Sequence, residues 1–555
     1  MSVAKQVKKV KSGSSVSHLF PLAAVVLPLF FATFYLPQAN YVPNVVTKLL
    51  SLAVTPILVV VALFSSKQWG KISFPRNLAI AVFAFIGYLL FRAAISGSLW
   101  QGFVGTSDRN LGILTYLVFF LFAWIGFQLT ERAKPKTFVY LLTLVGVGEA
   151  SIANYQYFIG EKSATTTGTF YNSNPVSFLL GIFASSLFAF LVYEKKKNTA
   201  EYSILVFGQL WILIALYICG SQQGLIIFLL IAAVLVITKK IRVLRVNFTK
   251  LLLPIFLGAL ATFIAAAYLV PIKDNIDLAY NAFFERLEIY KSALKLAFQY
   301  PLLGVGVDSF HEKYGNVTLT TLMQLADNAH SVPLQILSTL GFIGFALWLT
   351  VIFFVFSNGK SGVSEEQAEF KFFQIGFFSY LLIGIVGIEH PVIGAISWLM
   401  VGVLIKLSSS QLVERKLDKP SLVASNWEKA SVLAGSVALI SLSFYLFPQQ
   451  IVVGQALTEL SERRLSSSEY LTNSEFDAVM AENIDRIWSP ALLLTSGEAY
   501  IAIDQQVGAL AIANVMLEKY PSDQRTSILL FAIDRKWNDD KAKKLAEEVR
   551  DRIFK

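Results

Sequence analysis

Cysteine is almost missing from this chain, because its 555 residues include only Cys219. One cysteine cannot close an intramolecular disulfide, so any part that lies outside the cytoplasm must be stable without one. Charged residues are also scarce, at 15%, whereas hydrophobic residues make up 55% and the mean hydropathy is +0.59. This composition excludes a single soluble core of such length and is typical of a polytopic membrane protein.

The net charge of +10 comes from short basic clusters that separate the apolar runs. Such clusters are typical of cytoplasmic loops under the positive-inside rule, and they argue against nucleic acid as a partner. The sequence also lacks a GxxxxGK loop and a cluster of metal-ligand side chains, which argues against nucleotide-dependent and metal-dependent chemistry.

Apolar runs that are long enough, or nearly long enough, to cross a bilayer occur about thirteen times. They lie near residues 19–36, 47–65, 78–96, 111–129, 137–158, 175–193, 202–219, 223–238, 251–270, 333–357, 372–388, 391–408 and 430–447. The sequence therefore predicts an all-α polytopic membrane protein.

Basic residues are concentrated in every second loop, which predicts the orientation of the spans. The basic start, residues 1–18, is expected in the cytoplasm and precedes a retained first span rather than a cleaved signal peptide. Residues 19–447 then form the transmembrane domain of a cytoplasmic (inner) membrane protein. Its large loop 271–332 faces outward, and an odd number of spans also places the tail, residues 448–555, outside.

The tail is polar and has the amphipathic periodicity of helices. Gly497, Tyr500, Ala509 and Pro521 have the relative spacing of the tetratricopeptide pattern, whereas its Trp, Leu and Phe positions are not matched. Two interpretations stay open: a tetratricopeptide-like domain that binds a protein partner, or a small helical domain that covers the outer face.

His330 stands directly before an apolar run that Ser331 can cap and that Pro333 suits as a first turn. The N-terminus of a helix favours an anion and lowers the pKa of a histidine, which keeps the imidazole neutral and able to accept a proton. Gly341 and Gly344 would let a neighbouring helix approach closely. Alternatively, His330 is an interfacial histidine and the glycines only serve packing.

Arg286 lies in the stretch FFERLEIYKSALKLAFQYP, whose apolar residues recur at helical spacing. The stripe consists of Phe283, Leu287, Tyr290, Leu294 and Phe298. We expect this helix to lie in the membrane interface and to end at Pro301. There Arg286 could bind a lipid diphosphate through its planar fork, or it could be a surface residue paired with Glu285 or Glu288.

The arrangement His330, Ser331, nine residues, Gly341, two residues and Gly344, with Arg286 upstream, resembles the O-antigen ligase and polymerase family. The resemblance implies a polytopic glycosyltransferase that takes a glycan from a polyprenyl diphosphate carrier outside the cytoplasmic membrane. It also implies catalytic roles for His330 and Arg286, with no metal and no cofactor.

Two earlier loops are similar to further recognition stretches of that family. GTSDRNLG carries Arg109, a second candidate contact for the diphosphate, and TGTFYNSNPVSF carries Asn174. Both loops could equally be ordinary turns before the next span. The sequence departs from the family pattern in GSQQG, where Gln222 replaces an arginine. Either another cation substitutes, with Arg92 as a candidate, or the diphosphate is bound differently.

The substrate-binding set predicted here is Arg109, Gln222, Asn174, Asp327 and Asn328. Tyr290 also departs from the family, because a tryptophan often occupies its position. Of the titratable residues in unusual places, we expect Glu149 to face the bundle interior. Glu389 and His390 could line the same outer cavity as the site, but we expect them to be solvated at the interface.

The motifs do not separate a ligase from a polymerase of lipid-linked repeat units or from a protein O-oligosaccharyltransferase. The acceptor is accordingly a glycan, a lipid or a protein. Two alternatives from other classes are a polysaccharide or lipid transporter (flippase), which expects related halves with interrupted helices, and a non-catalytic scaffold that presents the tail.

Overall fold

The computed structural model describes most of the chain after residue 73. The described ranges are 74–95, 99–106, 109–130, 134–159, 166–170, 172–194, 198–238, 272–314, 326–359, 367–414, 448–463, 473–487, 490–521 and 523–554, together with single residues between 25 and 58 and residue 441.

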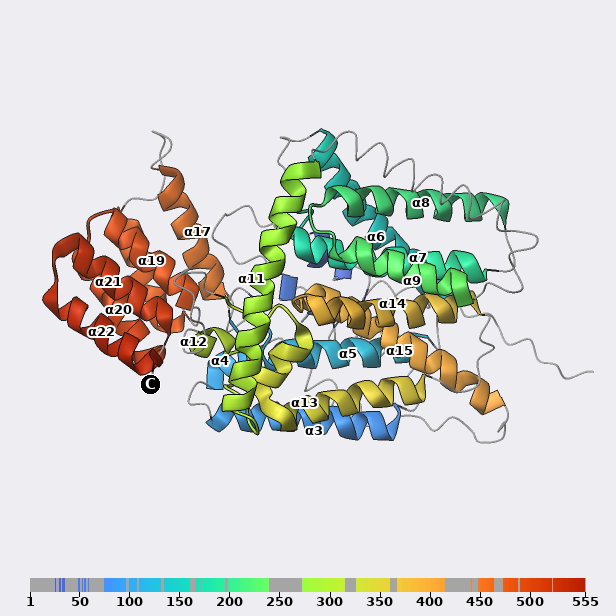
Figure 1. The fold of residues 1–555 in the computed structure, drawn as a ribbon, viewed down its shortest axis with the longest axis horizontal. Helices are drawn as coiled ribbons and strands as arrows, with labels where there is room; N and C mark the ends of the chain where they lie inside the picture. Colours follow the sequence, from blue (N-terminus) through green and yellow to red (C-terminus); the bar gives the residue numbers. More distant parts are fainter. Residues whose placement is uncertain are drawn as a thin grey trace, which may run out of the picture.

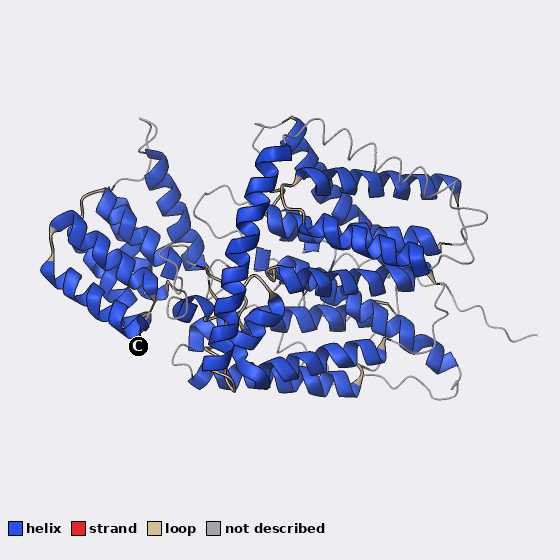
Figure 2. Ribbon diagram, viewed as in Figure 1, coloured by secondary structure: helices blue, strands red, loops and turns tan. Residues whose placement is uncertain are grey.

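Within these ranges every element is a helix (Figure 2). The helices are α3 (Arg76–Ile95), α4 (Leu99–Val104), α5 (Ile113–Leu129), α6 (Pro135–Phe158), α7 (Ser173–Tyr193), α8 (Thr199–Ile218), α9 (Gln223–Thr238), α11 (Ile272–Gln299), α12 (Phe310–Tyr314), α13 (Val332–Asn358), α14 (Ala368–Val386), α15 (Pro391–Glu414), α17 (Pro448–Arg463), α18 (Asn473–Asn483), α19 (Pro490–Ala502), α20 (Gln506–Lys519), α21 (Gln524–Trp537) and α22 (Asp540–Phe554). A short 3₁₀ turn, Ile484–Arg486, follows α18.

Seven of these helices, α3, α6, α7, α8, α13, α14 and α15, are long and apolar enough to cross a membrane. The shorter apolar helices Ile113–Leu129 and Gln223–Ile237 coincide with two more of the predicted runs. The remaining four predicted runs, near 19–36, 47–65, 251–270 and 430–447, fall wholly or largely outside the described residues. An integral membrane protein of many helices is therefore confirmed, and the total of thirteen spans stays a prediction.

The apolar helices lie side by side, and α11 crosses their ends (Figure 1). In the bundle, α5 packs on α15, α7 on α9 and α14, α6 on α8, and α3 on α13. The loops predicted to share one side of the membrane do meet at one end of this bundle: Ser177 donates to the carbonyl of Ser221 at 2.7 Å, and Arg92 donates to the carbonyl of Leu303 at 2.6 Å. We call this the His330 end.

Helix α13 is broken at Gly341, whose φ of 67° and ψ of −173° lie outside the helical region. The turn formed by residues 301–306 inserts there and pairs with the freed backbone groups. Phe342 N–H donates to the carbonyl of Pro301 at 2.7 Å, while Val305 N–H and Gly306 N–H donate to the carbonyls of Ser338 and Thr339 at 3.0 and 2.9 Å. The sequence predicted Gly341 only as a site of close helix approach, and the structure shows a backbone role instead.

Replacing Gly341 with alanine should destabilise the protein, because a Cβ would overlap the backbone of Leu302 and Leu303 at a left-handed φ. The φ alone costs about 1–3 kcal/mol. Gly87→Ala is the matched control, since Gly87 lies in helix α3 with nothing within 4 Å of its added Cβ. We expect a lower thermal midpoint for purified Gly341→Ala than for Gly87→Ala, and equal midpoints would contradict the strained break.

The C-terminal helices, α17 to α22, share an apolar core of their own that includes Phe476, Met516 and Leu529. The residues with tetratricopeptide spacing fall on one helix pair: Gly497 and Tyr500 lie on α19, and Ala509 lies on α20. A Cβ on Gly508 would meet the ring of Tyr500, which shows how closely α19 and α20 approach. These observations confirm the helices and leave the tetratricopeptide assignment as an expectation.

Candidate functional site

His330 lies in a tight turn at the start of α13. Its φ is 51°, its N–H donates to the side-chain oxygen of Asn328 at 3.0 Å, and its carbonyl accepts from the hydroxyl of Tyr290 at 3.2 Å. Tyr290 belongs to α11, so this hydrogen bond joins the crossing helix to the turn that carries His330. Asn328 was predicted to bind substrate, but it is buried and its oxygen is used by the turn.

Ser331 occupies the N-cap of α13 as predicted, and Pro333 lies in the first turn, yet the Ser331 side chain makes no capping hydrogen bond. The side-chain oxygen of Gln335 instead accepts from Ala329 N–H at 2.9 Å. The predicted role of the Ser331 hydroxyl is therefore wrong, because Gln335 reaches back over the turn and takes an N–H before the helix.

Asp327 and Arg109 form an ion pair beside His330. Arg109 Nε lies 2.7 Å from Asp327 Oδ2, and Arg109 Nη2 lies 3.4 Å from Asp327 Oδ1. The guanidinium and the carboxylate therefore form a bidentate ion pair. Their side chains are 20% and 16% exposed, so the pair stays open to a ligand. Although burial opposes ionisation, the charge and hydrogen bonding of Arg109 hold the pKa of Asp327 below its usual range.

The protonation of His330 follows from these neighbours. Burial lowers the pKa of His330 to about 4, and the positive charges of Arg109 and Arg286 act in the same direction, against Asp327. An imidazole with such a pKa is neutral at pH 7 and can accept a proton. The predicted neutral state thus has a physical basis here, with burial rather than the helix dipole as the main cause.

Arg286 approaches the site from α11 and is half-buried. The amide of Gln223, with its oxygen turned toward the guanidinium, accepts from Arg286 Nη2 at 2.7 Å. The preceding residue, Gln222, stands where the family has an arginine, and its side chain is exposed. The sequence singled out Gln222, whereas the structure brings Gln223 to Arg286.

Asp308 is a buried residue that holds the loop carrying Arg109. Its Oδ2 accepts from Thr106 N–H at 2.7 Å, from Thr106 Oγ1 at 3.1 Å and from Leu111 N–H at 3.3 Å, and so it holds both sides of the Arg109 loop. Burial raises the pKa of Asp308 to about 6. Sequence reasoning missed this residue, although its place after Gly304 and Gly306 was a usable signal.

Arg92, the candidate substitute for the missing family arginine, is buried and donates to two carbonyls of the inserted turn, Leu303 at 2.6 Å and Gly304 at 2.8 Å. The guanidinium of Arg92 therefore stabilises the inserted turn and does not face a ligand. Asn174 lies in the first turn of α7, where its N–H donates to Asn172 at 2.9 Å, and no hydrogen bond in the described ranges joins it to His330.

Glu389 and His390 were expected to be solvated, but they are 8% and 5% exposed. Tyr380 donates to Glu389, and His390 packs edge-on against Phe170 at 4.9 Å. Burial raises the pKa of Glu389 to about 7 and lowers that of His390 well below its usual value. The expectation was wrong because α14 and α15 bring this turn beneath neighbouring loops.

Glu149 faces the interior as predicted and is fully buried. Its two carboxylate oxygens accept from Thr169 N–H at 2.8 Å and from Thr169 Oγ1 at 3.0 Å, and Lys48 donates to that same hydroxyl at 3.4 Å. This network fixes the turn before Asn172 and Asn174.

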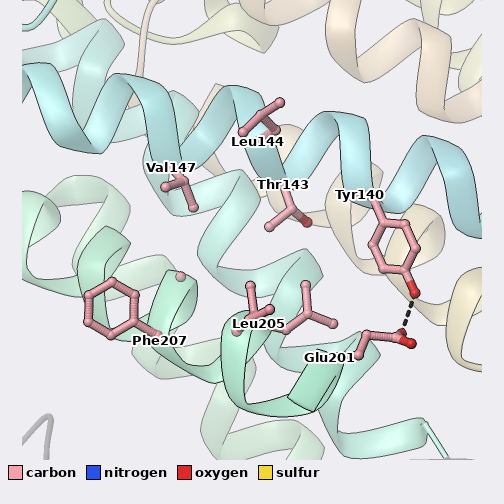
Figure 3. Close-up of a pocket in the computed structure, with 9 residues that line it drawn as sticks. Tyr140, Thr143, Leu144, Val147, Glu201, Leu205 and Phe207 are labelled. Carbon is pink, nitrogen blue, oxygen red and sulfur yellow. Dashed lines mark hydrogen bonds between the residues drawn. The ribbon is translucent and has the colours of Figure 1, made fainter. Parts of the chain in front are cut away.

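A separate hollow of about 380 Å³ opens between α6 and α8 (Figure 3). Leu144, Val147 and Phe207 form apolar walls, and the Tyr140 hydroxyl donates to Glu201 at one side. It contains none of the predicted site residues. Within the described ranges, no group of three His, Cys, Asp or Glu side chains could hold a metal ion.

The apolar bundle and the polar cluster at its His330 end define an integral membrane protein with a candidate site at the ends of its helices. Residues 207–349 match the sequence model of the family described as O-antigen ligase, so this range of the chain is similar to that family. A comparison with curated proteins finds no match. The matched range contains His330, Arg286 and Asp327, whereas Arg109 and Asn174 precede it.

Proposed function

We propose that this protein is a membrane glycosyltransferase that transfers a glycan from a polyprenyl diphosphate carrier to an acceptor hydroxyl on the outer face of the cytoplasmic membrane. The observation that carries the proposal is the convergence of one neutral imidazole, His330, with two guanidinium groups, Arg286 and Arg109. A base next to two cations suits the attack of a hydroxyl on a sugar whose leaving group is a diphosphate.

In this mechanism His330 accepts the proton of the acceptor hydroxyl as the hydroxyl oxygen forms a bond to the anomeric carbon. The bond between that carbon and the diphosphate oxygen breaks, and the negative charge that develops on the diphosphate is stabilised by Arg286 and Arg109. Asp327 orients Arg109 through their two-pronged contact, and the chemistry proposed requires no cofactor.

The deciding experiment supplies purified, reconstituted protein with a polyprenyl diphosphate-linked glycan. We expect the glycan to leave the carrier and to appear on a hydroxyl of a second molecule. A product in which the second molecule is another lipid-linked glycan would identify a polymerase, and a glycosylated protein would identify an O-oligosaccharyltransferase. A carrier that stays fully glycosylated would overturn the proposal.

The break in α13 is one feature that a transporter or flippase would also show. Here the inserted turn takes up the freed backbone groups next to the site, which favours a structural role for the break. A transporter would move the lipid-linked glycan across a vesicle membrane with its diphosphate bond intact, and the same reconstituted protein distinguishes the two outcomes.

The proposal also requires the His330 end to face outward, with the C-terminal helices on the same side. Val507 is 84% exposed on α20, whereas Cys219 is buried and gives little background. A cysteine at Val507 should react with a membrane-impermeant maleimide in intact cells, and labelling only after lysis would reverse the orientation.

A further inference from the structure

The C-terminal helices contact the short helix α12 through buried polar side chains. His311 Nε2 lies 3.1 Å from Asp523 Oδ2, and these side chains are only 3% and 2% exposed. His311 belongs to the short helix α12, which lies between α11 and the C-terminal helices (Figure 1). Asp523 caps α21, because its side chain accepts from Arg525 N–H at 2.7 Å.

Arg525 completes this contact. Its Nη1 lies 3.7 Å from Asp523 Oδ2, and its side chain is 8% exposed. Buried charges are costly unless they are paired, so the groups at this contact depend on one another. Burial by itself would raise the pKa of the Asp523 carboxyl. The interactions with His311 and Arg525 nevertheless hold that pKa below its usual range.

Arg525 and the segment around His311 are also connected to the candidate site. Arg525 acts on Asp327, since it is one of the positive charges that favour the ionised carboxylate there. Asp308, three residues before His311, holds the loop that carries Arg109. The contact is therefore connected to the loop of Arg109 through α12 and Asp308.

We propose that Arg525 and Asp523 of the C-terminal helices are positioning residues for the site formed by Arg109, Asp327 and His330. Arg525 pairs with the Asp523 carboxylate that contacts His311. Through α12 and Asp308, this contact is connected to the loop that presents Arg109 to a diphosphate. Asp523 holds Arg525 and His311 in place. The proposal rests on the proposed function and assigns the C-terminal helices a role in donor binding.

The test measures binding of undecaprenyl diphosphate to the full chain in lipid nanodiscs. Arg525→Gln should weaken binding roughly 2- to 30-fold, the range of couplings that act through a second residue. Arg525→Lys should recover much of the loss, because it restores the charge. The matched control is Lys536→Gln on the same helix, whose exposed ion pair with Asp504 at 3.3 Å does not reach the site.

A second readout does not depend on donor binding. Asp523→Asn keeps a good helix cap but removes the charge that faces His311. We expect faster amide hydrogen exchange in residues 301–314 of this variant. Unchanged binding in Arg525→Gln, or equal losses in Arg525→Lys, would overturn the positioning role. The two failures can be distinguished. If amide exchange is faster in Asp523→Asn but the wild-type protein does not bind undecaprenyl diphosphate, the proposed function fails while the contact between α12 and the C-terminal helices stands.

Discussion

Replacing His330 with alanine should lower the turnover of reconstituted protein roughly 10²- to 10⁴-fold, the usual effect of removing a general base. Binding of undecaprenyl diphosphate should stay nearly unchanged, because Arg286 and Arg109, the two arginines proposed to contact the diphosphate, are retained. This separation of turnover from binding is what distinguishes a proton acceptor from a diphosphate ligand. A loss of binding equal to the loss of turnover would contradict the assignment.

The pH dependence gives an independent check on His330. Since its pKa is lowered to about 4, the imidazole is neutral throughout pH 5 to 8. A base is active when it is unprotonated, so its activity is lost only as the pH falls toward 4. A cationic histidine that stabilised the leaving diphosphate would show the opposite sign. Turnover that declines as pH rises from 5 to 8, with the decline lost in His330→Gln, would rule out the base.

Replacing Arg286 with alanine should weaken donor binding roughly 10- to 100-fold, which corresponds to the loss of about 1.5–3 kcal/mol for a hydrogen bond to a charged group. Arg286→Lys should rescue only part of this loss, because an ammonium keeps the charge without the two-pronged geometry. Both the binding and the turnover of the lipid-linked donor should fall.

The matched control for Arg286 is Lys291→Ala on the same helix. Lys291 is 55% exposed and pairs with Glu288 at 2.6 Å, as a surface residue of α11 does. Its loss should leave donor affinity within about twofold of the wild-type value. Equal losses in the two variants would show that the overall positive charge of α11, rather than the fork of Arg286, attracts the donor.

The sequence predicted the apolar helices well, because hydropathy depends only on neighbouring residues along the chain. The runs 137–158 and 333–357, for example, coincide closely with α6 and α13. The gathering of His330, Arg286, Arg109 and Asp327 was predicted from motifs, and the structure brings these four together.

Other features depend on contacts between distant segments, which hydropathy and spacing do not report. Asp308 acts on a loop some 200 positions earlier in the chain, and Arg525 comes from a different core. The solvated state expected for Glu389 failed for the same reason, since burial depends on which helices pack beside a turn. The structure places Gln223 rather than Gln222 next to Arg286. A shift of one position along a helix changes the direction of the side chain by about 100°.

Helix α11 carries apolar side chains that the described chain covers only in part: Leu287, Leu294 and Phe298 are 36%, 40% and 70% exposed. If α11 lies in the membrane interface as expected, these side chains would meet lipid beside Arg286, the arginine proposed to bind the donor. The thickness and headgroup composition of the membrane then set the depth of Arg286. Under the proposed function, turnover measured in detergent micelles and in bilayers of different lipids should therefore differ, because the surrounding lipid would form part of the donor site.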